Sequence, residues 1–145
     1  QSFDHSQSEV RGLRHLAIKV RSVAHARAFY MDFFGMQVVW APDPQNVYLS
    51  SGVDNLALHE LPAEEPPLAE PQGQVLDHLG FIMASVGGVD RLYQRALEAG
   101  IRIVKLPKRH RDDSYSFYLA DPDGNVVQVL YEPTISPMEF HSPNP

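Results

Sequence analysis

Apolar and polar residues alternate near the start of the chain and then change to a helical spacing. Residues 15–20 alternate strictly, which is the period-two pattern of a β-strand with one buried face. Residues 23–34 place apolar side chains on one helical face, between the N-cap candidate Ser22 and the helix-terminating Gly35. Further strands are predicted over about 36–41, 46–51 and 55–61, with a turn at 42–45.

The same order of elements returns in the second half of the chain. His15-Leu16-Ala17 opens the first stretch, and His78-Leu79-Gly80 opens the second, 63 residues later. The second stretch predicts a strand over about 77–84, a helix over about 88–99 and strands over about 101–106, 114–120 and 125–131. We therefore predict an α+β fold of two tandem βαβββ modules, with curved mixed sheets, a concave site face and the helices outside.

Prolines divide this sequence into parts. Four of them lie with acidic residues in 62–71, and four more lie in 133–145, so both segments are predicted to be irregular. We predict one domain over 13–132, made of module one (13–61), a linker (62–75) and module two (76–132), with a flexible tail at 1–12 and a Pro-rich tail at 133–145.

Composition narrows the range of functions. Lys and Arg number 12 and Asp and Glu number 18, so the net charge is 12 − 18 = −6, which argues against nucleic-acid binding. The chain has no cysteine, which excludes disulfides, thiolate metal sites and a cysteine nucleophile. No uninterrupted apolar stretch predicts a membrane span or a signal peptide, and we predict a cytoplasmic protein without membrane or nucleic-acid partners.

Strand alternation also predicts which polar side chains face away from the helices. If the apolar positions pack on the helices, four polar residues lie on the other face of the sheets: His15, His59, His78 and Gln128. A one-residue slip would replace His59 with Glu60. Imidazole is a common ligand of Zn, Ni, Fe and Mn, and an amide oxygen is a weaker one. Metal ligation and ordinary hydrogen bonding at strand ends are both open interpretations of these residues.

Several motifs together resemble one known superfamily. They are the two His-Leu strand openings, the helix end Ala28-Phe29-Tyr30-x-x-x-Phe34-Gly35 and the turn Asp121-Pro122-Asp123-Gly124-Asn125. Over residues 13 to about 132 the chain resembles the vicinal oxygen chelate superfamily, which includes glyoxalase I, type I extradiol dioxygenases, fosfomycin-resistance thiol transferases and bleomycin-binding proteins. The resemblance implies metal ligands at His15, at His59 or Glu60, at His78 and at Gln128. Metal-binding members usually have Glu at the position of Gln128, so this chain departs from the pattern there.

A second resemblance is to the extradiol dioxygenase signature. It consists of His110, Phe117-Tyr118, Asp121-Pro122-x-Gly124 and Gln128, with departures at Lys108 and at Gln128 itself. The resemblance implies that His110 is an acid/base and that Tyr118 hydrogen-bonds a catechol. The alternative is that His110 lies in a solvated basic loop, because Lys and Arg occupy positions 105, 108, 109 and 111.

These observations favour a metal-dependent enzyme over a binding protein. We predict a divalent-metal-dependent enzyme that acts on a small substrate with two adjacent oxygens, by isomerase/lyase or dioxygenase chemistry. The alternative is a metal-free protein that binds or sequesters a small molecule, as bleomycin-resistance proteins do. The two interpretations differ in the cofactor: the first predicts a divalent Fe, Mn, Ni or Zn ion, and the second predicts none. The resemblance also favours a homodimer.

Overall fold

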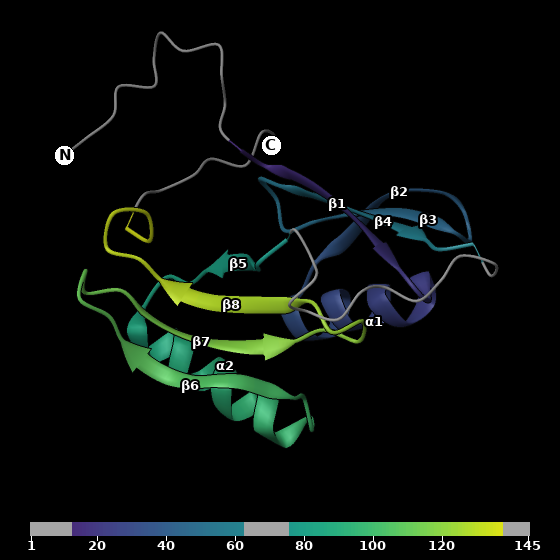
Figure 1. Cartoon of the computed structure of the whole chain (residues 1–145). Helices are drawn as coiled ribbons and strands as arrows, with labels where there is room; N and C mark the ends of the chain where they lie inside the picture. Colours follow the sequence, from purple (N-terminus) through teal and green to yellow (C-terminus); the bar gives the residue numbers. More distant parts are fainter. Residues whose placement is uncertain (1–12, 63–75, 138–145) are drawn as a thin grey trace, which may run out of the picture. The chain divides into compact units, whose positions relative to one another are not determined.

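The computed structural model describes residues 13–62 and 76–137, which form parts of two compact units (Figure 1). One unit contains module one and the other contains module two, and each is described by itself. The predicted tail at 1–12, the linker beyond residue 62 up to 75 and the last eight residues of the Pro-rich tail lie outside the described residues. Residues 133–137, where that tail begins, form turns.

Module one contains one helix and a four-stranded sheet. Its elements in chain order are β1 (His15–Val20), α1 (Val23–Phe34), β2 (Gln37–Asp43), β3 (Asn46–Ser50) and β4 (Asn55–Glu60). The strand order is β1-β4-β3-β2, with β1 and β4 parallel and the other neighbours antiparallel. The helix connects β1 to β2 and packs against β3 and β4.

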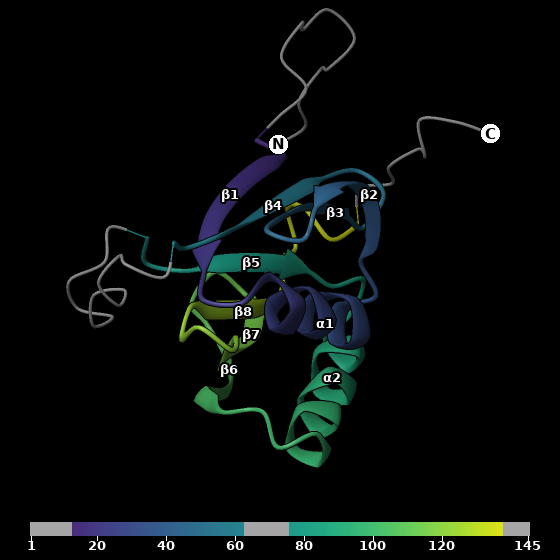
Figure 2. The same ribbon diagram turned by 90° about the vertical axis from the view of Figure 1, so that its right-hand side faces the viewer.

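Module two repeats this topology. Its elements are β5 (Leu79–Ile82), α2 (Val86–Glu98), β6 (Ile103–Arg109), β7 (Tyr115–Ala120) and β8 (Val126–Tyr131). In the strand order β5-β8-β7-β6, β5 and β8 are parallel and the other neighbours are antiparallel, and α2 packs against β6, β7 and β8 on one face of the sheet (Figures 1 and 2). The predicted fold class, two tandem βαβββ modules with mixed sheets, is confirmed.

The helix boundaries follow from local capping. The Ser22 hydroxyl accepts a hydrogen bond from the His25 N–H at 3.1 Å, and α1 ends at Gly35 with a left-handed φ of 73°. In α2 the Ser85 hydroxyl accepts from the Gly88 N–H at 2.9 Å. Because Ser85 caps the helix, its first turn includes two glycines and begins two residues before the predicted start at about 88.

Two strands run further than the sequence predicts. β2 continues through Pro42 and β6 continues through Pro107, although proline cannot donate to a β-ladder. Both are edge strands, which have a neighbouring strand on one side only. Proline is tolerated there because an N–H on the other side has no strand to bond. The register against β3 and β7 also shifts along each of them, which is typical of a bulged edge.

The core lies between each sheet and its own helix. Leu58, Val127 and Val129 are fully buried, and Leu56 is 4% exposed, as the alternation predicts. We call the face of each sheet away from its helix the open face. Neither described helix has the length and apolar content needed to span a membrane.

Candidate functional site

Gln128 occupies the centre of the open face of module two. It pairs with Gly80 on β5 and with Tyr118 on β7, so the three residues form one row across the sheet. Gly80 has no side chain, and a Cβ placed there would lie 3.9 Å from Gln128 Oε1 and 3.6 Å from its carbonyl oxygen. Because residue 80 is glycine, no side chain at that position covers the β5 side of the Gln128 carboxamide.

His78 lies beside this row, just before β5. Its Nδ1 lies 2.6 Å from the Asp77 carboxylate, and its ring meets the Tyr118 ring edge-on at 5.4 Å. A carboxylate can only accept, so the Nδ1 of His78 carries the proton and donates it. A ring with its single proton on Nδ1 holds a lone pair on Nε2, the arrangement found in metal-binding histidines.

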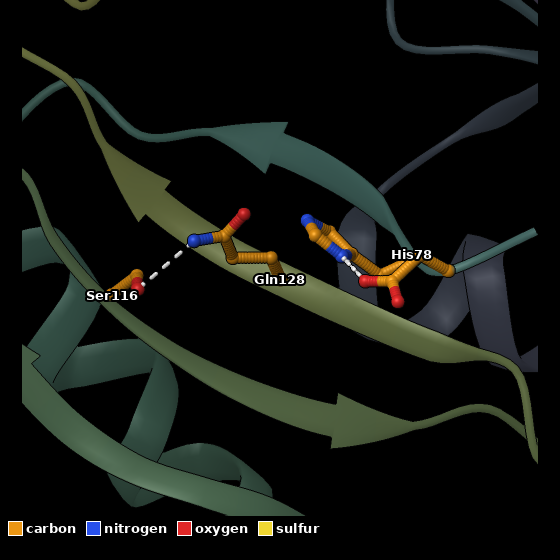
Figure 3. Close-up of polar contacts among 4 residues, drawn as sticks. His78, Ser116 and Gln128 are labelled. Atoms are coloured by element: carbon orange, nitrogen blue, oxygen red, sulfur yellow. Dashed lines mark hydrogen bonds and ion pairs between the residues drawn. The ribbon is translucent and has the colours of Figure 1, made fainter. Parts of the chain in front are cut away.

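The Gln128 carboxamide is held by a serine on the neighbouring strand. Gln128 Nε2 donates to the Ser116 hydroxyl at 3.0 Å, and the same hydroxyl lies 3.0 Å from His110 Nε2. Figure 3 shows the carboxamide oxygen turned away from Ser116, toward the side where His78 lies. Module two thus brings His78 and Gln128 to one face and links Gln128 to His110.

His110 lies at the end of the β6–β7 hairpin. Its backbone N–H donates to the Ser114 carbonyl at 2.8 Å, and Asp113 closes the turn with a left-handed φ of 69°. Hydrogen bonds from Ser114 lower the pKa of the Asp112 carboxyl in this turn. The imidazole is half-buried and points to Ser116, so it is not simply one of the exposed basic side chains around it.

The basic residues on β6 have partners of their own. The Lys105 ammonium lies 5.2 Å from the centre of the Tyr118 ring, and the Arg109 guanidinium lies 5.7 Å from that of Tyr115. Tyr118, one of the two predicted catalytic residues, therefore has a cation on its ring face and the His78 ring at its edge.

The open face of module one holds the other two predicted histidines. His15 Nδ1 lies 2.8 Å from Asn55 Oδ1, and His59 Nδ1 lies 2.6 Å from Asn46 Oδ1. Tyr48 makes edge contacts with both histidine rings and with Trp40. By register, His15 pairs with Asn55 and His59 lies four residues further along β4. At 3.3 Å per residue this separation is about 13 Å along the strands, so the two imidazoles are not neighbours.

Glu60, the alternative to His59, lies on the helix side of the sheet. Its Oε1 accepts a hydrogen bond at 2.9 Å from the N–H of Val23, the first residue of α1. A carboxylate is stabilised there by the exposed N–H groups and the positive end of the helix dipole. His59 rather than Glu60 is therefore the open-face residue at this end of β4.

The register identifies a module-one counterpart of Gln128 that was not predicted. Ala17, Ala57 and Tyr48 form the same row in module one that Gly80, Gln128 and Tyr118 form in module two. Ala57 thus occupies the position of Gln128, and His59 lies two residues beyond it. The repeated dipeptides Tyr48-Leu49 and Tyr118-Leu119 are the sequence signal that identifies this equivalence.

The donors of module two fit part of a metal coordination sphere. His78 Nε2 and Gln128 Oε1 are neutral ligand atoms, each with its second polar atom held by a neighbour. Across residues 13–62 and 76–137, no three His, Asp or Glu side chains gather as a complete metal-binding group. The donor set therefore fits a divalent ion at two positions and brings no negative charge of its own.

A family model describes nearly the whole of this architecture. Residues 12–129 match the Glyoxalase/Bleomycin resistance protein/Dioxygenase superfamily. The chain belongs to this superfamily. The predicted vicinal oxygen chelate resemblance is thereby confirmed, together with the fold that it implied.

Individual relatives of the superfamily have different names. An uncharacterised protein of Pseudomonas aeruginosa is 31% identical over 143 residues, covering 86% of this chain and 91% of the relative. Biphenyl-2,3-diol 1,2-dioxygenase 3 of Rhodococcus globerulus is 26% identical, covering 88% of this chain and 66% of the dioxygenase. The crystal structure of lactoylglutathione lyase from Agrobacterium tumefaciens superposes with a TM-score of 0.68 at 26% identity, covering 86% and 96% of the two chains. These superfamily relatives include both a dioxygenase and a lyase.

Proposed function

We propose that this protein is a divalent-metal-dependent enzyme for a small substrate with two adjacent oxygen atoms, and that His78 and Gln128 are metal ligands. The observation that carries the proposal is the Asp77–His78 hydrogen bond at 2.6 Å. It holds the imidazole proton on Nδ1, so that Nε2 is available as a ligand atom beside Gln128 Oε1 (Figure 3). Relatives named as a dioxygenase and a lyase support the same class of chemistry.

The chemistry follows from the two ligand atoms and the groups around them. A divalent ion held by His78 and Gln128 would supply Lewis-acid polarisation of the substrate oxygens. The Tyr118 phenol, on the same face, is placed to donate a hydrogen bond to a substrate oxygen. The nearby Lys105 ammonium favours substrates that carry or develop negative charge. Dioxygenase and lyase chemistry both remain within the proposal.

Metal binding is the first test of this function. The protein should be purified without chelators, its metal content measured, and titrations with Mn²⁺, Ni²⁺, Zn²⁺ and anaerobic Fe²⁺ followed by calorimetry. His78→Ala should abolish binding of the preferred metal, whereas His25→Ala, which removes an exposed histidine of α1, should leave it unchanged. Equal affinities in the two variants would exclude His78 as a ligand.

Replacing the neutral amide provides the complementary test. Gln128→Glu should tighten metal binding about tenfold or more, because it adds an anionic oxygen at the position where the superfamily usually has Glu. We also expect little catechol cleavage by the unmodified protein and more by Gln128→Glu, measured as yellow ring-opened product under air. Rapid turnover by the unmodified protein would refute the argument from ligand charge.

The predicted roles of the remaining site residues and of a second subunit stay predictions. If His15 and His59 are ligands as the superfamily pattern implies, His15→Ala and His59→Ala should each weaken metal binding. The predicted homodimer is tested by light scattering, because a mass of about 16 kDa at micromolar concentration would contradict it. Because His110 Nε2 contacts Ser116, the acid/base role predicted for His110 would fall to its Nδ1 unless that contact opens.

A metal-free binding function is supported by a separate observation. Trp40 is 52% exposed and its ring centre lies 4.9 Å from that of Tyr48, so module one presents exposed aromatic surface on β2. Such a surface suits stacking of a planar small molecule without any metal. Tight binding of a planar ligand that persists in EDTA and is lost in Trp40→Ala would favour this second function.

A further inference from the structure

The Ser116 hydroxyl is a buried group that neither the superfamily signature nor the predicted site includes. Ser116 is 1% exposed, on the middle of β7. Within the described residues its hydroxyl has two side-chain partners, Gln128 Nε2 and His110 Nε2, each at 3.0 Å. A buried hydroxyl between two side chains from other parts of the sheet is costly to bury unless it is fully hydrogen-bonded.

The number of protons on the Ser116 hydroxyl indicates which partner donates and which accepts in these two hydrogen bonds. A serine hydroxyl has one proton to donate and can accept from other groups. Because the Gln128 amide donates to Ser116, the hydroxyl proton is free for the second partner, and an imidazole nitrogen can accept it. His110 then accepts at Nε2 and carries its own proton on Nδ1.

We propose that Ser116 is a positioning residue, and that the one-way chain Gln128 → Ser116 → His110 turns the Gln128 oxygen to the open face. This inference deepens the proposed function, because the orientation of the carboxamide decides which atom Gln128 presents there. With the amide N–H₂ held by Ser116, the face presents two acceptors, His78 Nε2 and Gln128 Oε1. Two acceptors select a cation or a pair of hydroxyl donors, whereas an outward N–H₂ would repel a cation.

The chain also assigns His110 a supporting role. Its Nε2 is occupied as the terminal acceptor, so His110 acts through Ser116 on the orientation of Gln128. The turn around Asp113 and the His110–Ser114 backbone hydrogen bond place the ring for this contact.

Nuclear magnetic resonance of the unmodified, metal-free protein tests the direction of the chain. Long-range ¹⁵N–¹H correlations distinguish the two neutral imidazole tautomers, and the His110 signals are assigned by their loss in His110→Gln. We expect the His110 proton on Nδ1. In Gln128→Glu the carboxylate must accept from Ser116, so the chain should reverse and the proton should move to Nε2. A proton on Nε2 in the unmodified protein would overturn the proposal.

Replacement of Ser116 tests its effect on the ligand atom. Ser116→Ala should lower the affinity for the preferred metal roughly tenfold, as is typical when a group that orients a ligand is lost. It should also make the two Gln128 side-chain amide protons exchange faster with water. Ser116→Thr keeps the hydroxyl and should restore both properties. Ser85→Ala removes a hydroxyl at the N-terminus of α2, outside this hydrogen-bond chain, and should change neither property.

The two proposals fail in different ways. If no metal binds to any variant but the His110 tautomer and Gln128 exchange behave as expected, the proposed function fails and the positioning role stands. If metal binds through His78 but Ser116→Ala leaves both affinity and Gln128 exchange unchanged, the positioning role is refuted and the metal site stands.

Discussion

The two modules have one topology but different chemistry on their open faces. Each places a histidine at or just before the start of its first strand, with a tyrosine ring edge-on to it: His15 with Tyr48 at 6.1 Å and His78 with Tyr118 at 5.4 Å. The other positions around the tyrosines differ. The module-one residues are Trp40, Asn46 and Ala57, and their module-two counterparts are Lys105, Ser116 and Gln128.

The shared topology shows that the fold does not require polar residues at these open-face positions, so the polar residues of module two are candidates for function. The row Trp40, Tyr48 and Ala57 across the module-one sheet is uncharged, whereas the row Lys105, Tyr118 and Gln128 across the module-two sheet carries a cation and an amide. The side-chain hydrogen-bond chains on the two open faces also end on different groups. In module one His59 donates to Asn46, whose amide donates to the Asp43 carboxylate at 2.9 Å, so that chain ends on an anion. In module two the proposed hydrogen-bond chain ends on the His110 ring.

The largest difference is expected when the same charge is placed at the two equivalent positions. Ala57 is fully buried, so Ala57→Glu should lower the free energy of unfolding by about 3 kcal/mol or more, because it buries a carboxylate where the natural side chain is a methyl group. Gln128→Glu should change it by less than about 1 kcal/mol, since Gln128 is half-buried and Ser116 can donate to the new carboxylate. Urea unfolding followed by circular dichroism measures both. Similar losses would show that the two faces do not differ in this way.

The helix caps should behave alike in the two modules. Ser22→Ala and Ser85→Ala each remove one hydroxyl that accepts from a first-turn N–H, at a cost of about 1 kcal/mol each. Thermal unfolding of both variants, with Ser22→Asp and Ser85→Asp as capping-competent controls, makes the comparison. A large cost in only one module would mean that the two helices contribute unequally to stability.

Salt should distinguish the contacts on the two tyrosines. Lys105→Met removes a cation from the Tyr118 ring, a loss of about 0.5–1 kcal/mol at low ionic strength that should shrink as salt is added. Trp40→Leu removes a neutral ring contact with Tyr48 and should cost a similar amount at any salt concentration. Unfolding at 20 mM and 1 M salt tests both, and a salt-independent Lys105→Met effect would contradict a cation–π contribution.

The smallest expected effect is a loss of stability in alkali that originates in module two. The hydrogen bond that the Tyr115 hydroxyl donates to Asp90 at 2.6 Å raises the pKa of Tyr115 above its ordinary 10.0. A raised pKa in the folded state means that this contribution is complete below about pH 10 and is lost as the pH rises through the higher folded value. Tyr115→Phe should therefore cost less than about 1 kcal/mol at pH 8 and nothing at the alkaline end. A cost that is unchanged at high pH would exclude this hydrogen bond as its source.

Local signals account for the parts of the structure that were predicted. Alternation of apolar residues and the Ser and Gly caps depend on neighbours in the chain, so the elements and the outward direction of His78 and Gln128 could be predicted. The choice between His59 and Glu60 depended on register, because one slipped residue exchanges the two faces. It was settled only by the contact of Glu60 with the first turn of α1.

Contacts across strands explain what could not be predicted. A single buried serine has no periodic signal, so Ser116 emerges only when β7 and β8 are aligned. The equivalence of Ala57 and Gln128 was missed because the repeat does not keep one offset. It is 63 residues between His15 and His78, but 118 − 48 = 70 residues between Tyr48 and Tyr118.

Trp40 allows the unfolding of module one to be followed separately by tryptophan fluorescence. It is the single tryptophan of the chain and is half exposed on β2, in ring contact with Tyr48. Tryptophan emission therefore originates in module one, whereas far-ultraviolet circular dichroism sums the backbone of both modules. Coincident transitions by the two signals would mean that the modules unfold as one cooperative unit, and separated transitions would give each module its own stability. The protein thus contains its own optical label for one half of its fold.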